Sequence, residues 1–285
     1  MAGYAQPAAP FQRDHGKCRQ TLESGRAGGA GVNVLRKEVF TSFDGTELTL
    51  HRMGEGRPLL LLHGLFSSAQ MNWIKWGHAE RIAALGYEVL MLDFRVHGDS
   101  GAPHDPAKYP VNVLVRDVAA LVDHLGLDDY DLSGFSLGAR TALHGVSHGV
   151  LTPARLVIGG MGTAGLGEWE KRSVFFKRVI DEFDTIPRGD PAWYSVQFLR
   201  SQKVDRIAAR LLLDTMPDLD LALLSHVTIP TLVVCGDEDN DNGSAEDLAE
   251  LLPDATYVAV PGTHMGSVTK PELGQAIAHW LGAAN

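Results

Sequence analysis

The chain has 285 residues, which is long enough for one large α/β domain or two small ones. Hydrophobic residues make up 45% and charged residues 21%, a globular composition that excludes wholesale disorder. A formal net charge of −10 argues against nucleic acid and an anionic membrane surface as partners. No stretch approaches the ~18 apolar residues of a membrane span, and residues 1–31 hold no continuous apolar segment of a signal peptide. Cys18 and Cys235 lie in unlike contexts, which disfavours a structural disulfide, so a cytoplasmic protein is expected.

The predicted elements begin after a polar leader. Residues 1–34 are rich in Gly, Ala, Pro, Gln and Arg without hydrophobic period, and we expect them to be disordered. Apolar runs predict strands at 35–42, 48–53, 58–62, 87–92, 130–132, 156–158, 231–235 and 256–260. The Asp44-Gly45 pair between the first two strands favours a hairpin. Amphipathic segments predict helices at 70–85, 111–125, 137–148, 244–252 and 271–282. This alternation indicates a mainly parallel sheet covered on both faces, with ligands beyond the carboxyl ends of its strands.

One segment interrupts the alternation of strands and helices. Residues 165–226 show helical patterns and no convincing strand, and they carry seven aromatic side chains. We expect this insertion to form a helical cap, or lid, on a core made of residues 35–164 and 227–285. The aromatic residues suggest a small apolar substrate, although aromatic side chains at helical spacing also fit the interior of the cap itself.

A candidate nucleophile follows the fifth predicted strand. Residues 131–139 contain the pattern G-x-S-x-G, with Ser136 between Gly134 and Gly138. The pattern is weak in a chain with 31 glycines, but a predicted strand precedes it and a predicted helix follows it. Glycines at these positions permit a tight strand-to-helix turn from which the hydroxyl protrudes. An ordinary glycine-rich loop is the alternative interpretation.

A serine hydroxyl needs a base near neutral pH, and the position of His264 favours it among twelve histidines. His264 follows the last predicted strand and precedes the last predicted helix, which places it on a loop at the same edge of the sheet as Ser136. The other histidines considered lie in predicted loops or on helix faces, where a surface or packing role is the default.

A carboxylate should orient the base, and residues 236–241 supply four acidic side chains after the seventh predicted strand. A solvated acidic loop and a calcium loop are alternatives. The calcium pattern requires Gly and Glu where Asn242 and Leu248 stand, which argues against calcium. No metal cluster, phosphate-binding loop or cofactor fingerprint is evident, so we expect neither a metal nor a cofactor.

Backbone N–H groups must stabilise the oxyanion that forms when a serine attacks an acyl carbon. The loop after the third predicted strand contains His63, Gly64 and Leu65, and it should lie beside the nucleophile. We expect the N–H groups of Leu65 and Leu137 to form the oxyanion hole. His63 is expected to brace the loop through hydrogen bonds.

Five motifs in order carry a resemblance to a known family. They are His63-Gly64, Asp93-Phe-Arg-Val-His-Gly-Asp-Ser100, Gly134-Phe-Ser-Leu-Gly138, Gly236-Asp-Glu-Asp239 and Gly262-Thr-His264. Over residues 35–285 the chain resembles the α/β-hydrolase family, which implies a mostly parallel eight-stranded sheet flanked by helices and the order nucleophile, acid, base.

The resemblance also ranks the candidate acids. It implies Asp239 as the acid, with Asp237 in reserve and Asp241 third. The family usually has Gly where Val96 stands, and often where Ala139 stands; neither departure removes a catalytic group.

The resemblance leads to several candidate functions. Dehalogenases and epoxide hydrolases of similar fold carry an aspartate at the nucleophile position, so Ser136 disfavours both. The leading hypothesis is hydrolysis of a carboxylic ester, or a related acyl bond, of a small apolar substrate through an acyl-enzyme. Thioesterase and perhydrolase activities would use the same residues, and a non-catalytic receptor for a small ligand is a further alternative. The oligomeric state cannot be inferred from the sequence.

Overall fold

A computed structural model describes residues 34–283, so the predicted leader lies outside the described residues except for Val34. The strands are β1 (Arg36–Thr41), β2 (Glu47–Met53), β3 (Arg57–Leu62), β4 (Tyr87–Leu92), β5 (Asp131–Phe135), β6 (Arg155–Gly159), β7 (Thr231–Gly236) and β8 (Ala255–Val260). The α-helices are α1 (His78–Ala83), α2 (Val113–Leu125), α3 (Leu137–Ser147), α4 (Thr163–Gly167), α5 (Trp169–Asp181), α6 (Trp193–Ser201), α7 (Arg206–Leu213), α8 (Ala245–Leu251), α9 (His264–Val268) and α10 (Pro271–Gly282). A π-helix, η1 (Gln70–Ile74), and two 3-10 helices, η2 (Pro106–Lys108) and η3 (Leu221–His226), complete the described elements.

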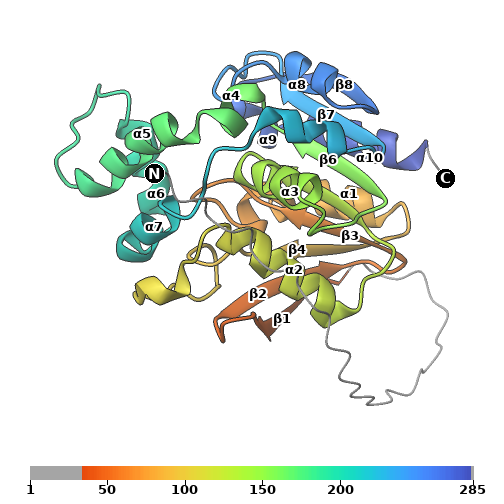
Figure 1. Cartoon of the computed structure of the whole chain (residues 1–285), viewed down its shortest axis with the longest axis horizontal. Coiled ribbons are helices and arrows are strands. Elements are labelled where there is room, and N and C mark those ends of the chain that lie inside the picture. The colour runs from red at the N-terminus through yellow and green to blue at the C-terminus, as the bar shows by residue number, and fades with distance from the viewer. Residues whose placement is uncertain (1–33, 284–285) are drawn as a thin grey trace, which may run out of the picture. The chain divides into compact units, whose positions relative to one another are not determined.

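The eight strands form one sheet in the order β1-β2-β4-β3-β5-β6-β7-β8 (Figure 1). Only β2 pairs antiparallel, with β1 and with β4, and every other pairing within the described residues is parallel. The predicted hairpin between the first two strands is present: the Ser42 N–H donates to the Thr46 carbonyl at 2.8 Å, and Gly45 adopts a φ of 85°. The expected mostly parallel, eight-stranded sheet flanked by helices is confirmed.

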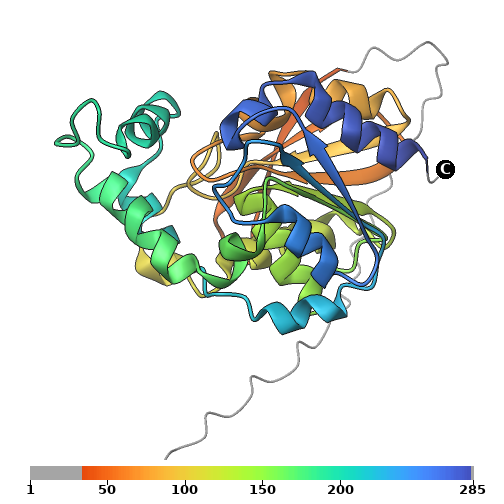
Figure 2. The ribbon, with the colours of Figure 1, turned by 90° about the horizontal axis from the view of Figure 1, so that it is seen from above.

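The sheet is buried on both faces because alternate side chains of a strand point to opposite sides. In β3, Leu60 and Leu62 join the hydrophobic core that includes α2, α3 and α8, whereas Leu59 and Leu61 join the core that includes α1 and α10. Figure 2 shows the same division, with α1 and α10 on one side of the sheet and α2, α3 and α8 on the other. A continuous leucine run is therefore what this strand requires.

The segment between β6 and β7 contains α4, α5, α6, α7 and η3 and no strand, and α5, α6 and α7 lie beyond one end of the sheet (Figures 1 and 2). The predicted start of the cap at residue 165 falls inside α4. Throughout this article we call residues 165–226 the cap segment.

One predicted helix is wrong. The segment 70–85 forms two elements, η1 and α1, rather than a single helix. Gly77 separates them with a φ of 74°, a left-handed conformation that ends a helix and that glycine adopts without strain.

No helix in the described range 34–283 combines the length and the apolar character needed to cross a membrane.

Candidate active site

Ser136 stands at a strained turn between β5 and α3. Its φ of 53° and ψ of −112° are unusual for a residue with a side chain, and its N–H donates to the Gly159 carbonyl of β6 at 2.8 Å. A Cβ atom at Gly134 would collide with the backbone of Gly138, and one at Gly138 would collide with the Leu62 carbonyl. The two glycines of the motif are therefore required by close backbone contacts, and the strained turn exposes the serine hydroxyl.

His264 reaches the hydroxyl from the other side of the site. Its Nε2 lies 3.0 Å from the Ser136 Oγ. The prediction of a loop was wrong here, because His264 is the first residue of the short helix α9. Thr263 caps this helix by accepting the Gly266 N–H at 3.2 Å. The cap sets the position of the histidine at the start of the helix.

Asp239 is the acidic side chain that contacts the histidine. Its Oδ2 lies 2.8 Å from His264 Nδ1, and its side chain is only 1% exposed. The Asp239 Oδ1 also accepts the Asp241 N–H at 3.1 Å, and Oδ2 accepts the Cys235 thiol at 3.4 Å. Asp237 is used differently, since its Oδ1 accepts the Gly262 N–H at 2.7 Å and so braces the loop before α9. The structure thus brings together Ser136, His264 and Asp239.

The protonation state of the acid follows from its surroundings. Burial raises the pKa of Asp239, but the hydrogen bond and electrostatic attraction of the His264 ring, together with the Asp241 and Cys235 donors, outweigh it and lower the pKa below the usual range. An ionised carboxylate can only accept, so His264 Nδ1 carries the proton. The His264 Nε2 lone pair is then free to accept the proton of Ser136.

Leu65 and Leu137 both line the cavity at Ser136. Leu137 is the first residue of α3, where a backbone N–H has no acceptor within the helix. The Leu65 N–H donates no hydrogen bond in the described part of the chain. A Cβ atom on Gly64 would lie 3.4 Å from the Ser136 Cβ, so the loop after β3 passes close to the nucleophile. The two N–H groups are available beside Ser136.

His63 holds this loop, as expected from the sequence. Its Nδ1 donates to the Gly64 carbonyl at 2.8 Å, and its Nε2 accepts the Phe94 N–H at 3.0 Å. Complete burial lowers the pKa of His63 although Asp93 is near, and the neutral ring suits one donated and one accepted bond.

The cavity at Ser136 is small, about 60 Å³. It is lined by Leu65, Ser136, Leu137, Arg140, Met161, Gly165, Trp169, Arg172, Phe176, Asp241, Asn242 and His264. Trp169 and Phe176 of α5 stack with ring centroids 5.8 Å apart, and Phe176 packs edge-on against Phe66 of the core at 6.1 Å. The cap segment therefore forms one wall of the cavity.

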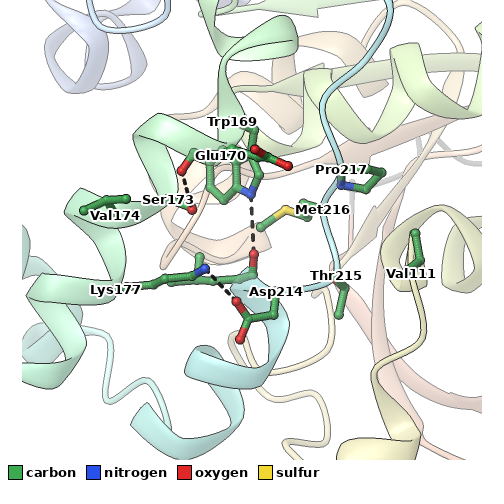
Figure 3. A pocket seen from close by; sticks show the side chains of 11 residues that line it. Val111, Trp169, Glu170, Ser173, Val174, Lys177, Asp214, Thr215, Met216 and Pro217 are labelled. Carbon is green, nitrogen blue, oxygen red and sulfur yellow. Dashed lines mark hydrogen bonds and ion pairs between the residues drawn. The ribbon is translucent and has the colours of Figure 1, made fainter.

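A larger cavity of about 480 Å³ is lined by Val111 and by residues of the cap segment, among them Trp169 (Figure 3). It contains the ion pair between Lys177 and Asp214, whose Nζ and Oδ1 atoms are 2.6 Å apart, and none of Ser136, His264 and Asp239 lines it. We place the chemistry in the smaller cavity because the reactive groups are there.

Two charged residues that line the cavity escaped the sequence analysis. Arg140 lies four residues after Ser136 in α3, and Arg172 lies in α5 of the cap segment. A charged residue among Ala139, Thr141 and Ala142 was the available signal for Arg140. Nothing local distinguished Arg172 from Arg178, the other arginine of its helix.

Two groups of side chains in the described chain have metal-ligand atoms within 4.8 Å of one another: His51, Asp93 and Asp99, and Asp239, Asp241 and His264. Asp93 already accepts the N–H groups of Ala69 at 2.7 Å and Asp99 at 3.1 Å. In the second group, both the Asp239 carboxylate and the His264 ring are engaged in the contacts described above. These hydrogen bonds account for both groups without an ion.

Comparison with known proteins agrees with this fold. A family profile described as the alpha/beta hydrolase fold matches residues 57–149. N-formylmaleamate deformylase from Pseudomonas putida is 36% identical over 106 residues, 37% of each chain. Epoxide hydrolase 2 from Siraitia grosvenorii is 32% identical over 102 residues, which are 35% of this chain and 31% of the relative. The chain thus spans about a third of the length of these curated relatives.

Solved structures match over most of the chain. A hydrolase from Pseudomonas aeruginosa superposes with a TM-score of 0.68 at 24% identity, covering 89% of this chain and 100% of the other. A thermophilic esterase from Thermogutta terrifontis superposes with a TM-score of 0.66 at 23% identity, covering 86% of this chain and 98% of the other.

Proposed function

We propose that this chain, which has the α/β-hydrolase fold, is a serine hydrolase that cleaves a carboxylic ester, or a related acyl bond, of a small molecule. The observation that carries the proposal is the continuous chain of contacts from the Ser136 hydroxyl through His264 to the buried Asp239, at 3.0 and 2.8 Å. No cofactor is needed for this chemistry.

The proposed reaction begins when the Ser136 Oγ attacks the acyl carbon while His264 Nε2 takes its proton. The acyl oxygen becomes an oxyanion, which the N–H groups of Leu65 and Leu137 stabilise. The tetrahedral intermediate then collapses: the bond to the leaving alcohol breaks, and the alcohol takes the proton from His264. Water, deprotonated by His264, attacks the acyl-enzyme, and the carboxylic acid leaves as Ser136 regains its proton.

Asp239 acts through His264 and not on the substrate. The buried carboxylate keeps the proton of the ring on Nδ1 and stabilises the positive charge that the ring gains after it accepts the serine proton. The lowered pKa of Asp239 supports this role, since the carboxylate stays ionised near neutral pH.

The names of the relatives favour hydrolysis but not one substrate. Those named epoxide hydrolases do not carry the proposal, because Ser136 stands where the resemblance implies an aspartate for that chemistry. A deformylase and an esterase among the similar proteins are consistent with acyl transfer to a serine.

Covalent labelling combined with turnover tests the proposal. A fluorophosphonate should label Ser136, and the wild-type chain should hydrolyse short-chain esters, whereas Ser136→Ala should neither be labelled nor turn over substrate. Ser133→Ala is a matched control on β5, the strand that precedes Ser136: its buried hydroxyl has no partner among the described residues, so its loss should leave activity unchanged.

The same experiment addresses the receptor hypothesis. Ligand binding without ester turnover would replace the enzyme proposal by that of a receptor on the same fold.

A further inference from the structure

The arginine nearest the nucleophile in sequence is buried without an anionic partner. Arg140 is 3% exposed and lines the cavity at Ser136. The only hydrogen bond of its guanidinium within the described chain is from Nη2 to the Pro217 carbonyl, and its buried Nε has no acceptor. Its guanidinium carbon also lies 5.4 Å from the ring centre of Trp169. A buried guanidinium is unfavourable unless its charge and its donors are matched.

A second arginine reaches the same cavity from the cap segment. Arg172 donates from Nη1 to the Asp241 carbonyl and from Nη2 to the Asn242 Oδ1 at 2.8 Å, and its buried Nε has no partner in the described residues. All hydrogen bonds of the two guanidiniums therefore end on neutral oxygen atoms. Neither arginine forms an ion pair within residues 34–283.

The acidic residues around the cavity do not neutralise these charges. The Asp239 carboxylate faces His264, while Asp241, the one acidic residue that lines the cavity, is exposed. Burial lowers the pKa of Arg140 to about 10 despite the nearby charge of Asp218, and it lowers the pKa of Arg172 despite Asp241, Asp239 and Glu168. Although the chain has a net charge of −10, two guanidiniums without an ion-pair partner in the described residues therefore line the cavity at its nucleophile.

We propose that the substrate carries a negatively charged carboxylate beside the acyl bond, and that Arg140 and Arg172 bind it. This rests on the proposed function and names its substrate class: short esters, or related acyl compounds, of dicarboxylic type. It replaces the apolar substrate expected from the aromatic residues of the cap segment, because two arginines also line the cavity. A guanidinium presents several N–H donors in one plane, and a carboxylate accepts them through two oxygens. The small cavity, about 60 Å³, limits the space between the acyl carbon and the carboxylate to a few atoms.

A purely structural role for Arg140 makes a different prediction. If the arginine only held the Pro217 carbonyl and the Trp169 ring, its loss would affect all substrates equally. If it binds a substrate carboxylate, its loss would affect charged substrates and spare neutral ones. The ratio of the two activities separates the roles.

The experiment uses two esters of the same shape. Monomethyl succinate ends in a carboxylate, and methyl 4-methylpentanoate ends in an isopropyl group of similar size without charge. Hydrolysis of each by the full chain is followed by proton release at constant pH. We expect the wild-type kcat/KM to be at least about 10-fold higher for monomethyl succinate, and we expect Arg140→Gln and Arg172→Gln to lower that preference by about 10- to 100-fold, mainly through KM.

Arg200→Gln is the control. Arg200 is exposed on α6, away from the lining of the cavity at Ser136. In the described residues its side chain donates one hydrogen bond, to Gln197 at 3.4 Å, and its guanidinium carbon lies 4.8 Å from the ring centre of Phe183, so its loss should leave both activities and their ratio unchanged. Should Arg140→Gln fail to fold, Arg172→Gln and the preference of the wild-type chain still decide the outcome.

The outcomes separate this inference from the function on which it rests. Equal turnover of the two esters, or variants that lose activity on both alike, would overturn the carboxylate proposal while leaving the serine hydrolase intact. Absence of turnover together with absence of fluorophosphonate labelling at Ser136 would overturn the proposed function itself.

Discussion

The molecule buries arginine in two contrasting ways. Arg95, fully buried after β4, donates to both oxygens of Asp117 at 2.6 Å and to Asp44 at 3.1 Å, and Asp117 also accepts the Ser42 hydroxyl at 2.6 Å. Arg140, almost as buried, has no carboxylate partner in the described chain. We call the hydrogen-bonded group of Arg95, Asp117, Asp44 and Ser42 the closed network. The guanidinium of Arg140, in contrast, has an N–H donor without an acceptor in the described residues.

The contrast distinguishes a buried arginine that stabilises the fold, Arg95, from one that is available to bind a ligand, Arg140. Structural charges in a protein interior are usually paired and fully hydrogen-bonded, because an unmatched group destabilises the folded state. Departures from this rule are expected at functional sites, where the ligand supplies the missing partner. In this chain the departure lies one helical turn after Ser136.

The largest effect is expected at the candidate active site, where both carboxylate oxygens of Asp239 accept hydrogen bonds. Asp239→Asn should lower kcat/KM for ester hydrolysis by about 10³- to 10⁴-fold, since the amide no longer holds the His264 proton on Nδ1. Steady-state kinetics alongside thermal unfolding would measure it. Activity within a few-fold of wild type would show that another acid, with Asp237 the reserve candidate, orients the base.

In the closed network, Arg95→Met should lower the free energy of unfolding by about 3–5 kcal/mol, because Asp117 and Asp44 would remain buried or partly buried without their cation. Urea denaturation measures the loss. The specific activity of the folded fraction should stay close to that of wild type, and a selective loss of activity would instead place Arg95 in the site.

A histidine beside the closed network, His97, predicts a pH dependence of stability. Burial lowers the pKa of His97 to about 3, and its Nδ1 donates to the Arg95 carbonyl at 2.9 Å. Between that pKa and about 6.5 the unfolded chain binds a proton that the folded chain does not, so stability falls as the pH drops through this window. Between pH 7.5 and pH 5.5, the free energy of unfolding should fall by about 1 kcal/mol less for His97→Asn than for wild type. Urea denaturation at the two pH values measures this difference. Identical losses would mean that His97 binds a proton as readily in the folded chain as in the unfolded chain.

The smallest change in stability is expected for Arg140, whose guanidinium has no carboxylate partner in the described chain. Arg140→Met removes an unpaired buried charge together with one hydrogen bond and one aromatic contact, so the opposing contributions should change the free energy of unfolding by less than about 1 kcal/mol. Urea denaturation of Arg140→Met beside Arg95→Met makes the comparison direct. A loss as large as that of Arg95→Met would show that Arg140 is a structural residue.

Much of the fold follows from local sequence. The leucines of β3 predict a strand buried on both faces, and Asp44-Gly45 predicts the first turn, because each depends on neighbours a few residues away. The helix break at Gly77 was missed, since an isolated glycine within an amphipathic pattern leaves its backbone conformation undetermined until the helix packs.

The sequence by itself determined the strand pattern, the turn at Ser136 and the position of His264 after the last strand. Only the tertiary structure decided that Asp239 contacts the histidine while Asp237 braces the backbone, and that Arg140 and Arg172, from distant helices, line one cavity. The reason is physical: burial and pairing of a charge depend on contacts between segments far apart in the chain, which local patterns do not encode.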